Sequence, residues 1–321
     1  MKLAAKLCWL VALAVATIGT TAMAEDTLKL AIGQRGNWEN AAPELGQKAG
    51  FFKKHGLALE LLYTQGAGET LQAVISGSVD LGIGVGTAGV LGAFAKGAPV
   101  RAIANSMTGA DDLFWYVPAT SPIKTIKDAA GKTIAYSTTG SSTNLAVLAF
   151  IREFGVQAKP VATGSPASTF TQTMSGQVDI GWSSPPFGVE ALQQGRIRIV
   201  VRESDVPAFR NQTVRLMIAN TATAEQRRDV IDRYLQAYRE TLDWMYSDPA
   251  ALKAYAEWVN IPENLAKEVR DQFYPKENLR LDRLSGLDVA MADAVSLKFL
   301  PAPLTKQQQD ELFKYYARGA K

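Results

Sequence analysis

Cysteine and histidine are almost missing from this chain. Its 321 residues include one cysteine, Cys8, and one histidine, His55. Cys8 lies close to the N-terminus, and the rest of the chain contains no cysteine. The rest of the chain therefore cannot form a disulfide framework, a thiolate metal site or a cysteine nucleophile. A lone histidine is a poor candidate for catalysis or metal binding. Because His55 ends a predicted helix, we expect it to interact with that helix C-terminus. We expect neither a metal nor a cofactor.

A strong net charge is also lacking. Lys and Arg together number 34, Asp and Glu together number 31, and the formal net charge is +3. Recognition of nucleic acid depends on a concentrated basic surface. The composition therefore argues against a nucleic-acid partner.

Long apolar runs are absent except near the N-terminus. Lys2 and Lys6 precede an apolar run over residues 7–18, and small residues follow up to Ala24 in an Ala-x-Ala pattern. This arrangement is typical of a secretory signal peptide, and the run is too short to span a bilayer comfortably. We expect residues 1–24 to be removed, leaving a periplasmic protein that does not insert into the membrane.

The chain that follows this segment is long enough for two lobes. Its 297 residues exceed one ordinary hydrophobic core. In its first part, predicted strands alternate with predicted helices, which indicates a parallel, doubly wound α/β sheet. We predict strands at residues 28–33, 57–63, 79–83 and 100–104, and helices at residues 41–54, 69–76 and 86–96.

A polar break over residues 105–112 separates this part from a second α/β unit. The second unit begins with a strand at residues 113–117 and extends to about residue 201. It contains a loop rich in hydroxyl groups and glycine at residues 137–142, followed by a helix at residues 143–154. The order of elements therefore predicts a second lobe of the same class.

One segment is repeated without gaps. Residues 70–82 align with residues 169–181, and both copies read as a helix, a Ser-Gly stop and a Val-Asp-apolar-Gly strand. Asp80 and Asp179 occupy the same position in the two copies. We therefore interpret these two carboxylates as structural groups of a helix-strand turn used once in each lobe.

The last hundred residues have the pattern of long helices. Residues 223–226 and residues 305–308 each match a capping box. Asp248 and Pro249 have the pattern of a helix N-cap followed by the first residue of a helix. Apolar side chains from Val230 to Met245 recur on one helical stripe. These features predict helices that pack on the first lobe.

Three segments in order resemble the bacterial nitrate/sulfonate/taurine family of ABC-importer binding proteins, which includes a thiamine-precursor-like branch. They are residues 49–57 (AGFFKKHGL), residues 73–82 (AVISGSVDLG) and residues 128–135 (DAAGKTIA). Each motif is weak alone, and their order after a signal-like segment makes the resemblance more specific. The resemblance spans essentially the whole chain beyond residue 24.

This resemblance implies the α/β type II periplasmic binding protein fold, in which a ligand cleft separates two doubly wound lobes. One lobe would comprise residues 25–108 and 213–321, and the other residues 109–212. The crossings would lie near residues 105–112 and 209–215. The family also implies a small-molecule ligand, an inner-membrane ABC permease as partner, and a monomer.

Ligands of open α/β sheets bind at the carboxyl ends of the strands, and five loops are expected there. Each could instead be an ordinary turn, surface loop or helix cap. The candidate ligand-binding residues are Gln34, Arg35, Gly36, Asn37, Trp38, Gly66, Ala67, Gly68, Gly86, Thr87, Tyr136, Ser137, Thr138, Thr139, Gly140, Ser141, Ser142, Trp182, Ser183, Ser184 and Pro185.

The side chains in these loops suggest two ligand classes. Arg35 offers a fork of donors for a carboxylate or sulfonate, and the loop at 137–142 precedes a helix N-terminus that suits an anion. Trp38, Tyr136 and Trp182 would instead provide walls or stacking surfaces for an aromatic or pyrimidine ligand. We expect a small organic anion and keep the aromatic ligand as the alternative.

Two enzyme classes compete with this interpretation. Gly84, Gly86 and Gly89 fit the G-x-G-x-x-G pattern of dinucleotide-binding oxidoreductases, with Asp111 and Asp112 about the expected distance beyond. However, the motif follows the third predicted strand, and an exported protein is separated from the nicotinamide pool. The yeast pyrimidine-precursor synthase shares the family fold, but the resemblance attributes its chemistry to a histidine and a cysteine-rich segment. We expect no enzyme.

Overall fold

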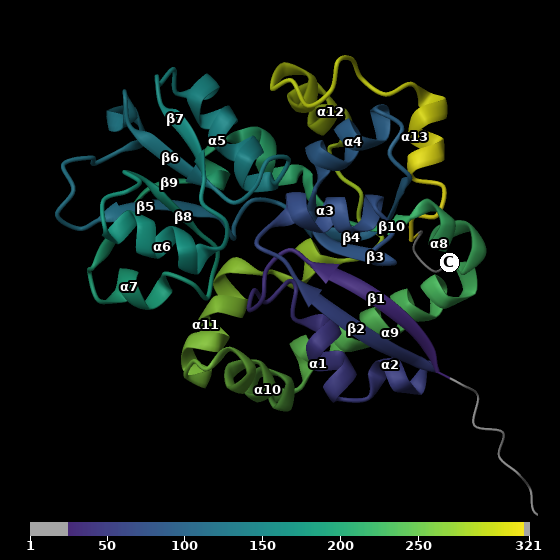
Figure 1. The fold of residues 1–321 in the computed structure, drawn as a ribbon. Helices are drawn as coiled ribbons and strands as arrows, with labels where there is room; N and C mark the ends of the chain where they lie inside the picture. Colours follow the sequence, from purple (N-terminus) through teal and green to yellow (C-terminus); the bar gives the residue numbers. More distant parts are fainter. Residues whose placement is uncertain (1–24, 318–321) are drawn as a thin grey trace, which may run out of the picture.

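The computed structural model describes residues 25–317, which form two lobes side by side (Figure 1). Lobe 1 contains a five-stranded sheet of order β2-β1-β3-β10-β4, and lobe 2 contains the sheets β8-β5-β9 and β6-β7. The predicted signal peptide lies outside the described residues. The strands are β1 (Asp26–Ile32), β2 (Leu57–Tyr63), β3 (Leu81–Gly86), β4 (Val100–Thr108), β5 (Phe114–Pro118), β6 (Thr133–Tyr136), β7 (Lys159–Ala162), β8 (Gly181–Ser183), β9 (Ile197–Arg202) and β10 (Thr213–Asn220).

The sheet of lobe 1 is mixed, so the prediction of a parallel sheet was wrong in part. β1 pairs in parallel with β2 and β3, but β10 pairs antiparallel with both β3 and β4. Our sequence analysis did not identify β10, whose first seven residues are all buried. It enters the sheet from far along the chain, in the register Met217 opposite Ala104. Local alternation of strands and helices carries no signal for such an insertion.

The predicted polar break also begins too early. Residues 105–108 continue β4, which is buried along its entire length. Asn105 pairs with Leu216 of β10, and its side-chain amide donates to the backbone oxygens of Asn278 and Arg280. These tertiary partners satisfy the polar side chain, and the strand therefore extends through a polar stretch.

Lobe 2 is assembled around β5, the first strand after the chain leaves lobe 1. β5 pairs antiparallel with β8 and β9, while β6 and β7 are parallel. A bridge between Ile134 and Ile180 connects the two small sheets into one layer. The chain therefore crosses between the lobes twice, after β4 and before β10.

Helices cover both sheets. The α-helices are α1 (Ala42–Lys48), α2 (Phe51–Lys54), α3 (Ala67–Ile75), α4 (Thr87–Ala95), α5 (Ser142–Glu153), α6 (Pro166–Met174), α7 (Val189–Gln193), α8 (Thr221–Gln226), α9 (Arg228–Ser247), α10 (Pro249–Val259), α11 (Glu263–Phe273), α12 (Leu287–Ser296) and α13 (Lys306–Leu312). The short 3-10 helices are η1 (Ile126–Ala129), η2 (Glu203–Asp205), η3 (Pro207–Asn211) and η4 (Lys276–Leu279). Within residues 25–317, none of the helices has both the length and the apolar character needed to cross a bilayer.

Two helix predictions need correction. The predicted helix at residues 41–54 is broken into α1 and α2, because Gly50 adopts a positive φ of 85° between them. The predicted capping box at residues 223–226 is wrong, since Asn220 caps α8 and Thr223 lies inside that helix. The Thr223 hydroxyl donates to Asp80 at 3.0 Å instead.

Other predictions are confirmed. The apolar stripe of α9 is buried, Asp248 caps α10, and Thr305 forms a capping box with Gln308 at α13. The repeated segment forms α3 with β3 in lobe 1 and α6 with β8 in lobe 2. Asp80 accepts the backbone N–H of Lys29, and Asp179 accepts that of Thr133, each at 2.9 Å. Both carboxylates therefore anchor the neighbouring strand, as a structural role requires.

Candidate ligand site between the lobes

A small buried cavity lies where the carboxyl ends of β1 and β3 in lobe 1 meet lobe 2. Its volume is about 30 Å³, close to the space of one water molecule. Both lobes line it. The predicted residues that it brings together are Gln34, Asn37, Ala67, Ser137, Ser141, Ser142 and Trp182, and the further lining residues are Gly33, Glu39, Asn40, Gly84, Leu113, Thr143 and Arg215.

The wall from lobe 2 contains the N-terminus of α5. Ser141 caps this helix, and its Oγ accepts the backbone N–H of Asn144 at 3.1 Å. The N–H groups of Ser142 and Thr143 belong to the first turn, which has no intrahelical acceptors. Beside them, the indole Nε1 of Trp182 is a buried donor without a partner. This wall presents hydrogen-bond donors, an arrangement suited to an anion.

A buried charge cluster that our sequence analysis missed joins the two lobes beside the cavity, with Glu39 and Arg215 in lobe 1 and Asp112 and Glu203 in lobe 2. The guanidinium of Arg215 donates to Glu39 and, at 2.7 Å, to Asp112. Glu203 is fully buried nearby. Burial raises the pKa of Glu39 to about 8 against the opposing effect of Arg215, and burial likewise raises the pKa of Glu203 well above its usual value. No local motif identifies this cluster, because its members come from four separate segments.

The glycine-rich segments of lobe 1 are covered by lobe 2. The backbone N–H of Gly68 donates to Thr138 Oγ1 at 2.9 Å, and a Cβ on Gly68 would lie 2.5 Å from the carbonyl oxygen of Thr139. A Cβ on Gly86 would lie 2.7 Å from the carbonyl oxygen of Gly140, and Gly89 is equally crowded by that oxygen. Glycine is therefore needed here for close approach of the lobes.

The close contact between the lobes explains the glycines of the G-x-G-x-x-G pattern, so no dinucleotide is needed to explain them. Gly86 and Gly89 face the loop of lobe 2, and Gly84 adopts a positive φ of 72° beside Glu39 and Asn40. Asp112, a candidate ribose ligand in the oxidoreductase interpretation, is instead paired with Arg215.

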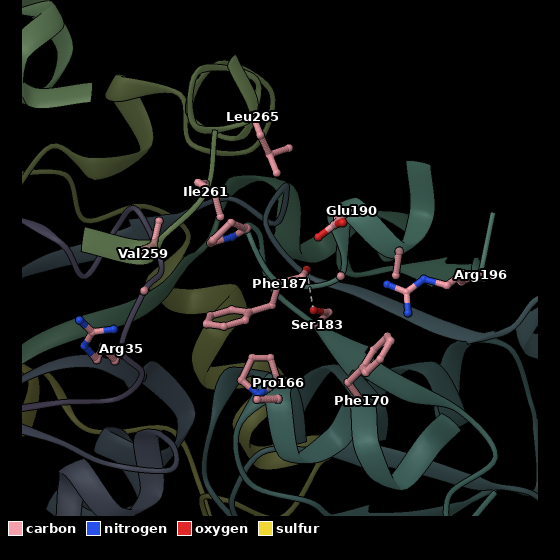
Figure 2. Close-up of a pocket in the computed structure, with 15 residues that line it drawn as sticks. Arg35, Pro166, Phe170, Ser183, Phe187, Glu190, Arg196, Val259, Ile261 and Leu265 are labelled. Atoms are coloured by element: carbon pink, nitrogen blue, oxygen red, sulfur yellow. Dashed lines mark hydrogen bonds between the residues drawn. The ribbon is translucent and has the colours of Figure 1, made fainter. Parts of the chain in front are cut away.

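A larger pocket of about 410 Å³ lies on another part of the same cleft (Figure 2). Arg35, Gly36 and Ser183 are the predicted residues on it. Arg35 comes from lobe 1, and its guanidinium lies 4.8 Å from the ring centre of Trp258. The other side carries Arg196 and Glu190 of lobe 2. The apolar walls are formed by Pro166, Ala167, Phe170, Pro186, Phe187, Ala191, Val259, Ile261 and Leu265.

A third pocket of about 220 Å³ lies beside both of these. Gln34 lines it together with the small cavity, and Arg35 lines it together with the larger pocket. Between the cavity and the larger pocket, Asn37 donates to Ser184 Oγ of the other lobe at 2.9 Å. The three spaces therefore form a series along the interface between the lobes.

The remaining predicted residues lie elsewhere. Trp38 is fully buried in the core of lobe 1, with its ring centre 4.7 Å from that of Tyr255, and lines none of these spaces. Tyr136 packs partly buried in the core. Thr87 donates to the backbone oxygen of Thr213, and Pro185 accepts from the hydroxyl of Tyr274. Of these remaining residues, those in contact across the lobes are Gly66, Gly68, Gly86, Thr138, Thr139, Gly140, Ser184 and Pro185.

His55 lies away from these spaces. It ends α2, as expected, and its Nε2 lies 3.1 Å from Glu240 of α9. Over residues 25–317, no group of three His, Cys, Asp or Glu side chains is arranged to hold a metal ion.

The model of the family described as NMT1/THI5 like matches residues 40–252. The chain belongs to this family. It is 21% identical over 248 residues to the 4-amino-5-hydroxymethyl-2-methylpyrimidine phosphate synthase THI12 of Saccharomyces cerevisiae, covering 72% of this chain and 70% of the yeast protein. The resemblance inferred from the three segments is thereby confirmed.

Solved structures share the fold at low sequence identity. The alkanesulfonate-binding protein SsuA from Xanthomonas axonopodis pv. citri, bound to MOPS, has a TM-score of 0.76 and 19% identity, over 92% of this chain and all of that one. The periplasmic nitrate-binding protein NrtA from Synechocystis PCC 6803 has a TM-score of 0.69 and 12% identity, over 91% and 86% of the two chains. The predicted periplasmic binding protein fold is therefore confirmed.

Proposed function

We propose that this protein is the periplasmic solute-binding component of an ABC importer and captures a small organic anion between its lobes. Residues 25–108 and 213–321 form one binding lobe, and residues 109–212 form the other. The two crossings between them act as the hinge. Ligand contacts to both lobes favour the closed form, which then docks on the inner-membrane permease.

The observation that carries this proposal is the series of spaces between the lobes, each lined by residues of both lobes. A solute held there contacts both lobes, which are connected by only two crossings of the chain. The free energy of binding therefore favours the closed arrangement of the lobes. The larger pocket, at about 410 Å³, falls in the size range of small-molecule sites.

Charge favours an anionic solute. The larger pocket has the guanidinium groups of Arg35 and Arg196 against the single carboxylate of Glu190. The small cavity has the donor wall at α5, where Trp182 Nε1 is unpaired. The predicted aromatic or pyrimidine ligand is the alternative, and it is favoured by the Phe170 and Phe187 rings that line the larger pocket.

We propose binding and not catalysis, although the yeast relatives are named as synthases. The chain's one histidine is engaged with Glu240 outside the cleft, and its one cysteine is Cys8 in the proposed signal peptide. Neither supplies a nucleophile or a metal ligand to the spaces between the lobes. The exported protein is proposed to act as a monomer without a nucleic-acid partner.

The test is a thermal-shift screen of the exported protein, followed by calorimetric titration. The screen includes alkyl sulfonates, taurine, nitrate, aromatic carboxylates, aminopyrimidines and NAD(H). A solute that binds only the folded protein raises its unfolding temperature as concentration increases. A response to one class of anion supports the proposal, whereas a response to NAD(H) alone contradicts it.

Arg35→Ala is the matching variant. The loss of a charge-assisted hydrogen bond is expected to weaken binding of the anion about tenfold or more, with the fold unchanged. Arg228→Ala is the control, because Arg228 pairs with Asp232 on α9 and lines none of the three spaces. Equal affinity of Arg35→Ala and the unaltered protein would remove Arg35 from the site.

A further inference from the structure

The hydroxyl of Ser184 lies at the contact between the lobes and is bonded to lobe 1 from two directions. Its Oγ accepts from the side-chain amide of Asn37 at 2.9 Å and lies 3.0 Å from the hydroxyl oxygen of Tyr274. Asn37 and Tyr274 belong to lobe 1, whereas Ser184 follows β8 in lobe 2. All three residues are buried, or nearly so in the case of the Tyr274 and Ser184 side chains, fully buried. Both hydrogen bonds therefore cross between the lobes in a region closed to water.

Tyr274 also holds the neighbouring backbone of lobe 2. Its hydroxyl donates to the carbonyl oxygen of Pro185 at 2.7 Å. Because a tyrosine hydroxyl has one proton, its oxygen is left to accept from Ser184. Asn37, Ser184, Tyr274 and Pro185 thus form one chain of hydrogen bonds in which each hydroxyl donates once. Asp112 Oδ2, at 3.4 Å from Ser184 Oγ, is a more distant acceptor for the same proton.

Each side of this chain is anchored in its own lobe. Tyr274 directly follows α11, and its carbonyl oxygen accepts from the hydroxyl of Tyr246 on α9. Ser184 directly follows β8, in which Ser183 pairs with Phe114 of β5. Neither side can follow the other when the lobes move apart about the two crossings. Opening therefore breaks all three hydrogen bonds between the lobes.

These hydroxyls act apart from the solute. Ser184 and Tyr274 line none of the three spaces between the lobes. Their contribution therefore depends on whether the lobes are together and not on the chemistry of the solute. Gln193 also donates to Glu268 across the lobes at 3.1 Å, but that hydrogen bond is exposed, and water can replace it.

We propose that Ser184 and Tyr274 form a latch, which favours the closed arrangement of the lobes before a solute enters and delays release afterwards. The inference rests on the proposed function for its purpose, because retention matters only where a solute is captured. Groups of the latch regain hydration when the lobes open. Each hydrogen bond therefore shifts the ratio of open to closed molecules by only about two- to tenfold.

Distances between the lobes in the solute-free exported protein test the latch. Because the chain beyond residue 24 contains no cysteine, spin labels can be attached through Asn264→Cys in lobe 1 and Gln177→Cys in lobe 2, both at exposed positions. Double electron-electron resonance then gives the ratio of open to closed molecules. Tyr274→Phe and Ser184→Ala each remove two of the three hydrogen bonds, and we expect each to raise this ratio about tenfold.

The double variant sharpens the test. Since Tyr274→Phe and Ser184→Ala both remove the hydrogen bond between the two hydroxyls, their combined effect should be smaller than the product of the single effects. Tyr316→Phe is the matched control, because this buried hydroxyl donates to the carbonyl oxygen of Arg283 at 3.0 Å within lobe 1. It should leave the ratio unchanged. Gln193→Ala should change the ratio about twofold or less, and circular dichroism checks the fold of every variant.

The outcomes separate the latch from the proposed function. An unaltered protein without a closed population overturns the latch, as does an unchanged ratio in Tyr274→Phe and Ser184→Ala. A shift of the same size in Tyr316→Phe also overturns it, because the loss of any buried hydroxyl would then have this effect. The solute screen is independent of these measurements. If no solute binds, the proposed function is wrong, while a latch measured in the solute-free protein stands.

Discussion

The two lobes present different hydrogen-bonding surfaces to the space between them. Lobe 1 contributes the unpaired oxygens of Asn37, Glu39 and Asn40, which accept, and the unpaired Nε of Arg215, which donates. Lobe 2 contributes donors, the Trp182 indole nitrogen and the first turn of α5. Each surface is incomplete when it is buried without a ligand. A solute with both kinds of groups completes both at once, so recognition and closure of the lobes are coupled.

The lobes also differ in what stabilises these surfaces. The lobe 1 surface lies against a buried ion cluster, in which Arg215 and Glu39 of lobe 1 meet Asp112 of lobe 2. The lobe 2 surface depends on a helix terminus and backbone groups. Charges buried in this way are expensive to expose singly. We therefore expect substitutions in the ion cluster to affect folding strongly, and substitutions on the donor surface of lobe 2 to affect mainly binding.

Arg215→Met should have the largest effect. It leaves Glu39 and Asp112 buried without their cation, which typically costs about 3–5 kcal/mol. Urea unfolding measures the loss. Arg280→Ala is the control, because Arg280 lies at the surface in its ion pairs with Glu277 and Asp282, and exposed ion pairs contribute little to stability. Similar losses for the two variants would contradict the importance of the buried cluster.

Gly89→Ala should oppose closure of the lobes without reducing the stability of α4. Alanine is better than glycine in a helix by about 1 kcal/mol, so α4 itself should not be weakened. The added methyl group, however, meets the carbonyl oxygen of Gly140 across the lobes. We expect affinity to fall about tenfold or more, because the 1–3 kcal/mol cost of such overpacking opposes the closed form.

Small-angle scattering provides the second measurement for this variant. The radius of gyration with saturating ligand should be larger than that of the unaltered protein. Ala95→Val, at the other end of α4, enlarges the same helix away from the loop of lobe 2 and serves as the control. Full affinity in Gly89→Ala would show that the glycines are not needed for approach of the lobes.

Trp182→Phe should have the smallest effect of the three. It keeps most of the aromatic ring and removes the unpaired Nε1 donor, so the expected loss of affinity is about three- to tenfold, the range for one neutral hydrogen bond. Titration with the bound solute measures it, and thermal unfolding without ligand should be nearly unchanged. A large loss of stability instead would mean that Trp182 is mainly a packing residue.

Much of the local structure could be predicted from the sequence. The strand at residues 57–63 has the predicted bounds, and the buried stripe of α9 follows from its periodicity. The caps at Asp248 and Thr305 depend on neighbouring residues alone. The predicted roles of Asp80 and Asp179 came from their equivalent places in a repeat. These features are local or repeated, and so the information for them is contiguous in the chain.

The candidate site was predictable only in outline. The loop at residues 34–38 and the loop at 137–142 do reach the interface of the lobes, as expected for loops after strands. However, the order of residues does not show which glycines face a ligand and which face the other lobe. Trp38 illustrates the same difficulty, since its position after β1 suggests the cleft while its ring is packed in the core.

By itself, the sequence determined the class of fold, most strands and helices, the caps, the repeat and the family. Only the tertiary structure decided that β10 lies between β3 and β4, and that Arg215 meets Glu39 and Asp112. It also decided that three buried oxygens face one cavity. The physical reason is distance along the chain. The β10 pairings and the Arg215 ion pairs join segments about a hundred or more residues apart. Their energy comes from complementary burial and charge that appear only when the segments are packed together.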